Sequence, residues 1–459
     1  MKVAVIGAGL AGLTAGCELA DLGHTVTVFE KRPFAGGKTY SYLDRESGEA
    51  VDNGQHVFMN CTTAYREFLR KIGTLHLTRR QKRLKVRVYG PGGNVSWLAA
   101  QALPAPLHLA LSFTRYGHLR LADKLRIGRT LLAVHRMTEA DRKGLHRIPF
   151  SDWLRGHGQT PEAIRDFWDF VLVPTLNCRA DDASTADALF VLREGFLKSS
   201  RSAGIGLAAV GLSELHVQPA VAYIERHGGS LRVSEPVAGI ELDGHERPLA
   251  IGIRLASGTL EPFEAVVCAV PHTAVSALLP PNLGAREPFA SLAAIPTAPI
   301  VNLHFWFDRP VADFAFAAFI GSELQWVFNR NRLDMDQRAG HHHLVVSLSD
   351  AAAYMPLSKA DLRERFLPQL GAALPAVGQA NLLKFAAIKE RDATFVPAPG
   401  LIRPGPRTPV ANLVLAGAYT DTGWPATMES AVRGGTAAAQ ELHATFRASW
   451  HTTSSPEGV

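Results

Sequence analysis

A glycine pattern near the start of the chain, set between a strand and a helix, constrains the fold most strongly. Val3–Ile6 is a short apolar run, and Gly7, Gly9 and Gly12 follow it in the spacing G-x-G-x-x-G. Apolar positions at helical period then continue through Leu19. Glycines at this spacing permit a tight turn, close approach of the backbone to a pyrophosphate, and close packing of helix on strand. The pattern predicts a dinucleotide-binding unit and therefore an α/β fold.

A second strand ends in the acidic residue that such a unit needs. Thr25–Phe29 is rich in β-branched residues, and Glu30 follows it directly. A carboxylate here can hydrogen-bond the ribose hydroxyls of an adenosine, and the first amides of the helix can bind phosphate. A glycine-rich turn that binds nothing is the alternative. The residues expected at the cofactor in this unit are Gly7, Gly9, Leu10, Ala11, Gly12, Glu30 and Lys31.

The residues after Glu30 distinguish between dinucleotides. The run Glu30-Lys-Arg-Pro-Phe-Ala-Gly-Gly37-Lys38 resembles the extended signature of the flavin amine oxidase and carotenoid desaturase superfamily, in which a Gly-Gly pair precedes Arg beside the pyrophosphate. Lys38 takes the place of that Arg, which keeps the positive charge but loses the bidentate fork. The resemblance implies FAD as the cofactor and a Rossmann-like domain of the glutathione-reductase type, with Gly36, Gly37 and Lys38 beside the phosphates.

The C-terminal part of the chain carries more of this resemblance. Leu413–Gly417 is typical of a strand ending in glycine, and a helix is predicted from about residue 426 through Leu442, with Pro425 before it. The superfamily has an acid directly after the glycine, where this chain has Ala418, so Asp421 is the candidate substitute in a non-covalent FAD site. Val237 is expected either to contact the adenine through its backbone or to be an ordinary strand residue. The resemblance adds Gly417, Ala418, Pro425, Ala426, Thr427 and Met428 to the cofactor site.

Four segments resemble a narrower family. They are Asp52-Asn-Gly-Gln-His56, Leu176-Asn177, Gly211–Pro219 and Thr422–Glu429, and together they are similar to the squalene-associated FAD-dependent desaturases, the hydroxysqualene dehydroxylases. The resemblance implies reductive dehydroxylation of an isoprenoid alcohol: an acid protonates the allylic hydroxyl, water leaves, and reduced flavin delivers hydride. The alternatives are a phytoene-type desaturase or amine oxidase on the same flavin site, and a non-catalytic lipid carrier on the same scaffold.

The proton donor is assigned to the first of these segments. His56 is the preferred donor, because an imidazole exchanges a proton near neutral pH, and Asp52 is expected to orient it. Gln55 is the third catalytic candidate, and the turn is expected to place Gly54, Gln55 and His56 along the flavin ring. A histidine held in the turn by backbone groups, without a catalytic role, is the alternative.

The flavin domain is predicted to be discontinuous, made of residues 1–75, 212–285 and 400–446. Residues 76–211 and 286–399 are predicted to form an interleaved α+β substrate domain, and 447–459 a disordered tail. In the strand 300–307, Asn302, His304 and Trp306 share one face, which either lines a ligand cavity or packs in the core. The substrate residues are expected to be Asn177, His304, Trp306 and Trp424. His341–His343 is predicted to be a loop, and no metal site is expected.

Charge and cysteine content indicate the compartment and the partners. The formal net charge is +6, and residues 103–137 mix leucine with arginine, which is typical of a helix on an anionic membrane or of a solvated surface helix. The four cysteines lack the spacing of a zinc site or a redox dithiol and are expected to be buried thiols. We therefore expect a cytoplasmic protein, peripherally associated with the inner face of the cell membrane. Its expected partners are a lipophilic isoprenoid substrate, the anionic membrane surface and other squalene-pathway enzymes, but no nucleic acid.

Overall fold

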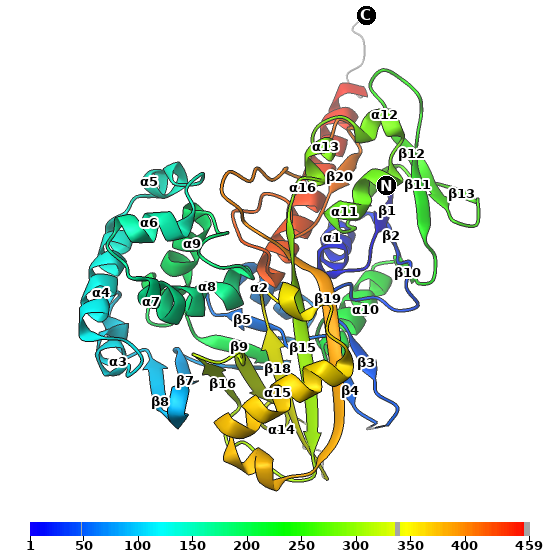
Figure 1. Ribbon diagram of the computed structural model, residues 1–459. Helices are drawn as coiled ribbons and strands as arrows, with labels where there is room; N and C mark the ends of the chain where they lie inside the picture. Colours follow the sequence, from blue (N-terminus) through cyan, green and yellow to red (C-terminus); the bar gives the residue numbers. More distant parts are fainter. Residues whose placement is uncertain (47, 336–339, 454–459) are drawn as a thin grey trace, which may run out of the picture.

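The computed structural model describes residues 1–46, 48–335 and 340–453. Figure 1 shows three regions: a parallel sheet with its helices, a large antiparallel sheet, and a lobe of helices beside that sheet. The strands are β1 (Lys2–Ile6), β2 (Thr25–Phe29), β3 (Ser41–Leu43), β4 (Ala50–Asp52), β5 (Val57–Met59), β6 (Thr78–Arg80), β7 (Lys85–Tyr89), β8 (Val95–Ala99), β9 (Ile205–Ala208), β10 (Ser230–Arg232), β11 (Val237–Leu242), β12 (Ala250–Leu255), β13 (Leu260–Pro262), β14 (Ala265–Cys268), β15 (Thr297–Phe307), β16 (Phe316–Phe319), β17 (Trp326–Asn329), β18 (His342–Leu348), β19 (Leu382–Phe395) and β20 (Leu413–Leu415). The α-helices are α1 (Leu10–Asp21), α2 (Thr63–Lys71), α3 (Ala110–Arg115), α4 (Leu121–Arg136), α5 (Glu139–Gly144), α6 (Phe150–Gly156), α7 (Pro161–Ala163), α8 (Asp169–Leu176), α9 (Thr185–Val191), α10 (Gln218–Arg226), α11 (His272–Val275), α12 (Pro281–Gly284), α13 (Phe289–Leu292), α14 (Arg330–Leu333), α15 (Lys359–Ala373) and α16 (Met428–Thr453).

The parallel sheet has the order β10-β2-β1-β14-β20 and draws its strands from three separate stretches of the chain. Both of its faces are covered. In β1, Val3 and Val5 pack with α1 and α16, whereas Ala4 and Ile6 pack with the β11–β13 sheet and α11–α13. Because side chains alternate across a strand, the apolar run at the start of the chain supplies both buried faces that a parallel sheet needs. The predicted Rossmann-like α/β architecture is confirmed, and the carboxyl end of β1 leads into the glycine turn.

The large sheet has the order β19-β15-β18-β17-β16-β7-β8 and is antiparallel except for the β16–β7 pair. Residues Val301, Leu303 and Phe305 of β15 pack on the same apolar cluster as Phe366 of α15. Asn302, His304 and Trp306 alternate with them, as predicted, and are also buried. Both faces of β15 are therefore packed.

The structure corrects several local predictions. His342 and His343 are not in a loop, because β18 extends to pair them with Phe307 and Trp306 of β15. The predicted tail is helical as far as Thr453, since a helix that has formed gains one hydrogen bond for each added residue; residues 454–459 lie outside the described residues. Cys61 is partly exposed, while the other three cysteines are buried free thiols.

The stretch 103–137 is not one helix. It forms α3 and α4 with an irregular connection between them, and α4 packs on the lobe through Ile127 and Val134. No helix among the described residues is long and apolar enough to cross a bilayer.

Candidate active site

The glycine turn after β1 forms a cradle with no side chains in it. Gly7 lies at a φ of +105°, a region that favours glycine. A Cβ on Gly12 would lie 1.9 Å from the Gly7 carbonyl oxygen, so that no larger residue fits there. Helix α1 begins after Gly9 with no side-chain cap and no acid in its first turn. No side chain therefore caps the start of α1, which is where a helix can bind an anion.

Glu30 is buried beside this turn. Its Oε2 accepts a hydrogen bond from the Ala8 amide at 3.1 Å and its Oε1 one from the Arg32 amide at 3.0 Å. Carboxylate oxygens have further lone pairs, so Glu30 can also accept from a ribose hydroxyl. The amide of Glu235 donates to the Glu30 carbonyl at 3.0 Å, and β11 begins two residues later at Val237. The contacts of exposed Lys31 and of Val237 with an adenosine stay predictions.

The Gly36-Gly37-Lys38 element closes the other side of the turn. The amide of Gly36 donates to the Ala8 carbonyl at 2.8 Å, and a Cβ on Gly37 would lie 2.8 Å from the Gly9 Cα. Lys38 is held differently from our expectation, because its Nζ donates to the backbone carbonyls of Asp392 and Ala393 on β19. Burial lowers the pKa of Lys38. A contact between Lys38 and a pyrophosphate stays a prediction.

Two glycines that sequence analysis missed join the C-terminal segment to this turn. A Cβ on Gly434 would lie 2.4 Å from the Gly417 carbonyl oxygen, and one on Gly435 would lie 2.3 Å from the Ala11 carbonyl oxygen. Helix α16 can therefore touch both the end of β20 and the start of α1. A Gly-Gly pair inside a helical pattern is the sequence signal for such packing.

The residues that precede α16 are held by contacts with neighbouring side chains. The Ala418 carbonyl accepts from Ser430 Oγ at 2.9 Å. Asp421, the candidate substitute for the missing acid, is 3.6 Å from Arg403 and 64% exposed. Its carboxylate is therefore engaged by Arg403.

Taken together, the uncapped start of α1, the glycine cradle and buried Glu30 fit the adenosine and pyrophosphate of FAD.

The segment Asp52–His56 leaves β4 and turns toward the large sheet. His56 Nδ1 lies 2.9 Å from the Gly54 carbonyl oxygen, to which it donates. Burial lowers the pKa of His56, partly opposed by the carbonyls of Gly54 and Lys38 and the charge of Asp52. We predicted that Asp52 orients this ring, but Asp52 Oδ1 instead accepts from Ser41 Oγ at 2.7 Å and the Leu212 amide at 2.9 Å. The backbone of Gly54 therefore does the orienting.

Gln55 points into a buried polar cluster that sequence analysis did not anticipate. Its Oε1 accepts from Arg330 Nη1 at 3.1 Å, and Arg330 also lies 3.6 Å from Asp52. A cavity of about 10 Å³ lies among Gln55, Arg330, His304 and His343, which is about the space of one water molecule. No local pattern marks Arg330 as buried, because only the fold of β17 and α14 places it there.

The predicted ligand face of β15 belongs to the same cluster. His304 Nδ1 is 3.1 Å from His343 Nε2, and Trp306 Nε1 donates to Glu49 Oε2 at 3.2 Å. His341 Nε2 lies 2.7 Å from Glu49 Oε1. Burial lowers the pKa of His304 to about 3, so that this ring is neutral. Within the residues described, no group of histidine, cysteine and acidic side chains could hold a metal.

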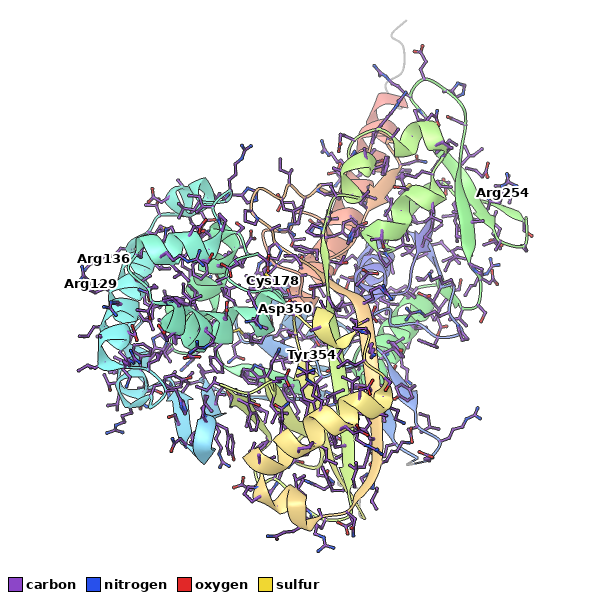
Figure 2. The ribbon with its side chains drawn as sticks, in the orientation of Figure 1. Arg129, Arg136, Cys178, Arg254, Asp350 and Tyr354 are labelled. Atoms are coloured by element: carbon purple, nitrogen blue, oxygen red, sulfur yellow. The ribbon has the colours of Figure 1, made fainter. Side chains whose placement is uncertain are left out.

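The other two predicted substrate residues lie apart from this cluster. Asn177 ends α8, and its amide nitrogen donates to Ala298 O at 3.0 Å and Thr394 Oγ1 at 2.9 Å. Its Oδ1 accepts from the amide of Asp350, labelled in Figure 2 near Cys178, where the helical lobe meets the large sheet. These bonds use both the nitrogen and the oxygen of the Asn177 amide group. The Leu176-Asn177 segment therefore has a structural role. Trp424 packs edge-on against Phe190. Substrate contact stays a prediction for all four residues.

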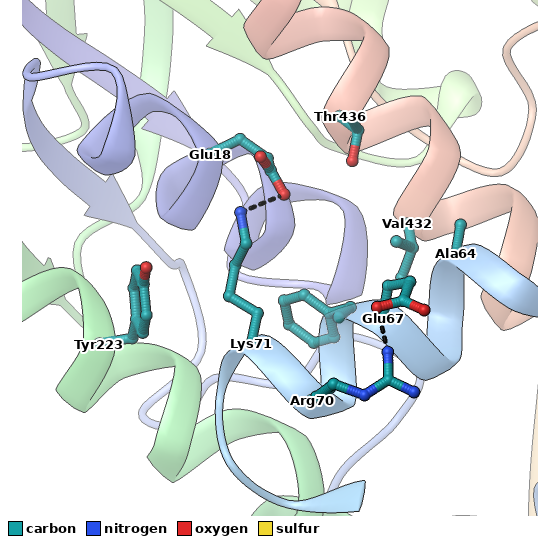
Figure 3. Close-up of a pocket in the computed structure, with 9 residues that line it drawn as sticks. Glu18, Ala64, Glu67, Arg70, Lys71, Tyr223, Val432 and Thr436 are labelled. Carbon is teal, nitrogen blue, oxygen red and sulfur yellow. Dashed lines mark hydrogen bonds and ion pairs between the residues drawn. The ribbon is translucent and has the colours of Figure 1, made fainter.

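A separate open cleft of about 600 Å³ lies between α1, α2, α10 and α16 (Figure 3). Lys71 binds Glu18 and Asp21 there, each at 2.7 Å. Glu18 is two helical turns from the start of α1, about 12 Å along the axis. No predicted cofactor or substrate residue lines this cleft, and its paired charges offer no site for the flavin chemistry.

Comparison with known proteins agrees with the cofactor site. Residues 10–443 match the family described as flavin containing amine oxidoreductase. The chain is 30% identical to the hydroxysqualene dehydroxylase of Rhodopseudomonas palustris, over 97% of this chain and 99% of that protein. It is 30% identical to the enzyme of that name from Sinorhizobium fredii, over 95% and 97%. It is also 26% identical to the 15-cis-phytoene desaturase of Synechococcus elongatus, over 96% of each chain.

Solved structures share the fold. An oxidoreductase from Methanosarcina mazei superposes with a TM-score of 0.72 at 16% identity, covering 96% of this chain and 100% of the other. Wild-type putrescine oxidase bound to putrescine gives a TM-score of 0.71 at 16% identity, covering 97% and 99%.

Proposed function

Because this chain belongs to the flavin containing amine oxidoreductase family and is an FAD-dependent oxidoreductase, we propose that it converts hydroxysqualene to squalene by reductive dehydroxylation. The observation that carries the proposal is the 30% identity, over nearly the whole length, to two hydroxysqualene dehydroxylases. Desaturation of a phytoene-like substrate is the second candidate, favoured by the 26% identity to a phytoene desaturase.

The reaction breaks one C–O bond and forms one C–H bond. The hydroxyl oxygen accepts a proton and leaves as water, and the allylic carbon then accepts a hydride. Reduced FAD, when bound, supplies this hydride with its two electrons. The chain must therefore bring a proton to the hydroxyl oxygen and keep bulk water from the cation that remains.

His56 is the proposed proton donor. With Nδ1 donating to the Gly54 carbonyl, Nε2 is the ring atom that can receive and release a proton. Because burial lowers the pKa of His56, its protonated form is a stronger acid than an exposed imidazolium. Gln55, fixed by Arg330, would position the substrate hydroxyl or the flavin edge beside it.

Cofactor binding is proposed to use three parts of the chain. The cradle of Gly7, Gly9 and Gly12 with the first amides of α1 would hold the pyrophosphate. Glu30 would accept from the adenosine ribose. The residues Gly417–Met428, which lead into the start of α16, would lie at the flavin end.

The test is anaerobic incubation of the purified protein with chemically reduced FAD and hydroxysqualene, with product identification by mass. A parallel reaction contains oxidised FAD and phytoene. Squalene from the first reaction supports the proposal. A desaturated product from the second alone would replace it with the second candidate, and protein that cannot be loaded with FAD would refute both.

A further inference from the structure

The outer face of the helical lobe exposes leucines beside arginines. Helix α4 runs along one edge of the molecule, and Arg129 and Arg136 point from it away from the body (Figure 2). The exposed fractions of the leucines in this region range from 39% to 74%. We call the following residues of α4 the leucine–arginine face: Leu121, Leu125, Leu132, Arg129 and Arg136.

The leucines of α4 form a stripe on the side that faces away from the protein. At about 100° per residue, Leu121, Leu125 and Leu132 fall within about 40° of one another around the helix. The buried residues of α4, among them Ile127 and Val134, fall on the opposite side. An ordinary surface helix places its polar residues opposite its buried face. Helix α4 therefore has two apolar faces, and only one of them packs on the protein.

The charge of this region is concentrated and of one sign. Residues 94–137 contain six basic residues and one acid, Asp123, which gives +5 of the chain's formal +6. Asp123 is buried and bound to Arg126 at 2.9 Å, so it places no free negative charge on the surface. By helical position, Arg129 and Arg136 lie along one side of the leucine stripe, at about 40–60° from its centre.

We propose that the leucine–arginine face docks on an anionic lipid bilayer. The leucines enter the boundary between headgroups and acyl chains, and the arginines bind lipid phosphates. Charge complementarity favours this occupant, since a neutral bilayer or an apolar protein groove would leave the charges of Arg129 and Arg136 unmatched. The attachment goes beyond the proposed reaction and does not depend on it.

The test is flotation of the full-length protein with vesicles of phosphatidylcholine alone or mixed equally with phosphatidylglycerol. The wild type should bind the mixed vesicles and release at high salt. The double variant Arg129→Gln/Arg136→Gln should lose about 25-fold in partition, at about fivefold for each basic residue. Leu121→Gln/Leu125→Gln, which keeps helix propensity, should lose about tenfold or more.

Matched controls replace exposed aliphatic and arginine side chains elsewhere on the protein with glutamine. These are Leu260→Gln/Ile402→Gln and Arg247→Gln/Arg286→Gln, which should bind as the wild type does. Bound FAD should be unchanged in all variants, which excludes misfolding. Wild-type protein that binds neither kind of vesicle would overturn the proposal. So would control variants that lose as much partition as the variants of the face, or leucine variants that bind normally. None of these results depends on whether squalene is formed.

Discussion

Glu429 offers a sharp test of whether a motif residue acts in chemistry or in structure. It belongs to the Thr422–Glu429 segment, yet its side chain is fully buried and directed at the start of α2. Its carboxylate accepts from the amides of Ala64 at 3.1 Å and Tyr65 at 2.7 Å, and from Arg433 Nε at 2.7 Å. Helix α2 has no side-chain cap of its own. Glu429 therefore caps α2 from α16.

The substitution Glu429→Gln keeps the shape but replaces one carboxylate oxygen with an amide NH2 group, which faces a donor. A hydrogen bond to a charged group contributes about 1.5–3 kcal/mol and a neutral one about 1 kcal/mol, so weakening three bonds costs about 3 kcal/mol. Since the Arg433 side chain is 35% exposed, solvent reduces its share, and about 2–4 kcal/mol is expected. At about 2.1 cal/mol/K of unfolding entropy per residue, the melting temperature of this 459-residue chain should fall by about 2–4 °C.

The matched control is Glu441→Gln on the same helix. Glu441 binds Arg407, whose side chain is 80% exposed, so its loss should cost no more than about 0.5 kcal/mol. Thermal unfolding and FAD content are measured for both variants. Equal melting temperatures of the Glu429→Gln and Glu441→Gln variants would refute the capping argument. Loss of turnover in Glu429→Gln with unchanged stability and FAD would instead place Glu429 in the chemistry.

Three further predictions concern the cofactor turn, the proton donor and acid stability. Gly12→Ala should abolish FAD binding, because its Cβ meets the Gly7 carbonyl oxygen at 1.9 Å, whereas Gly128→Ala, with open space around it, should retain flavin absorbance. His56→Gln should keep FAD but lower kcat by about 10²–10⁴-fold. The wild-type rate should fall as pH rises through the pKa of His56, which lies below 6.5, and a pH-independent rate would contradict this role. His216 and His304, with pKa values of about 3, bind protons when unfolded but not when folded between pH 6.5 and about 3. The free energy of unfolding should therefore decrease as the pH falls through that range, by about 1.4 kcal/mol per pH unit for each histidine. Urea midpoints at pH 7 and 5 measure this decrease.

The start of the chain could be predicted because its signals are local. The strand β1, the turn at Gly7 and helix α1 follow one another directly, and each is favoured by its own residue types. Glu30 likewise follows the strand that places it. Apolar alternation along β15 also predicted correctly that Asn302, His304 and Trp306 share a face.

The polar cluster beside the predicted flavin face could not be predicted in this way. Glu49 is far along the chain from Arg330 and His343, and each of the three is an ordinary polar residue in its local sequence. Their burial follows from β4, β15 and β18 coming together, and the lowered pKa of His343 follows from that burial. Asp52 is bound in part by distant residues too, since the Leu212 amide and Arg330 join the nearby Ser41 around its carboxylate.

By itself the sequence determined the dinucleotide-binding turn, the likeness to a flavoprotein family and the concentration of charge in residues 94–137. Only the tertiary structure decided that Gly54 rather than Asp52 holds His56, that Glu429 caps α2, and that the leucines of α4 face outward. The physical reason is how far apart in the sequence the interacting residues are. A turn or a helix is set by neighbours along the chain, whereas burial, hydrogen-bond partners and the outward face of a helix depend on which distant segments pack against it.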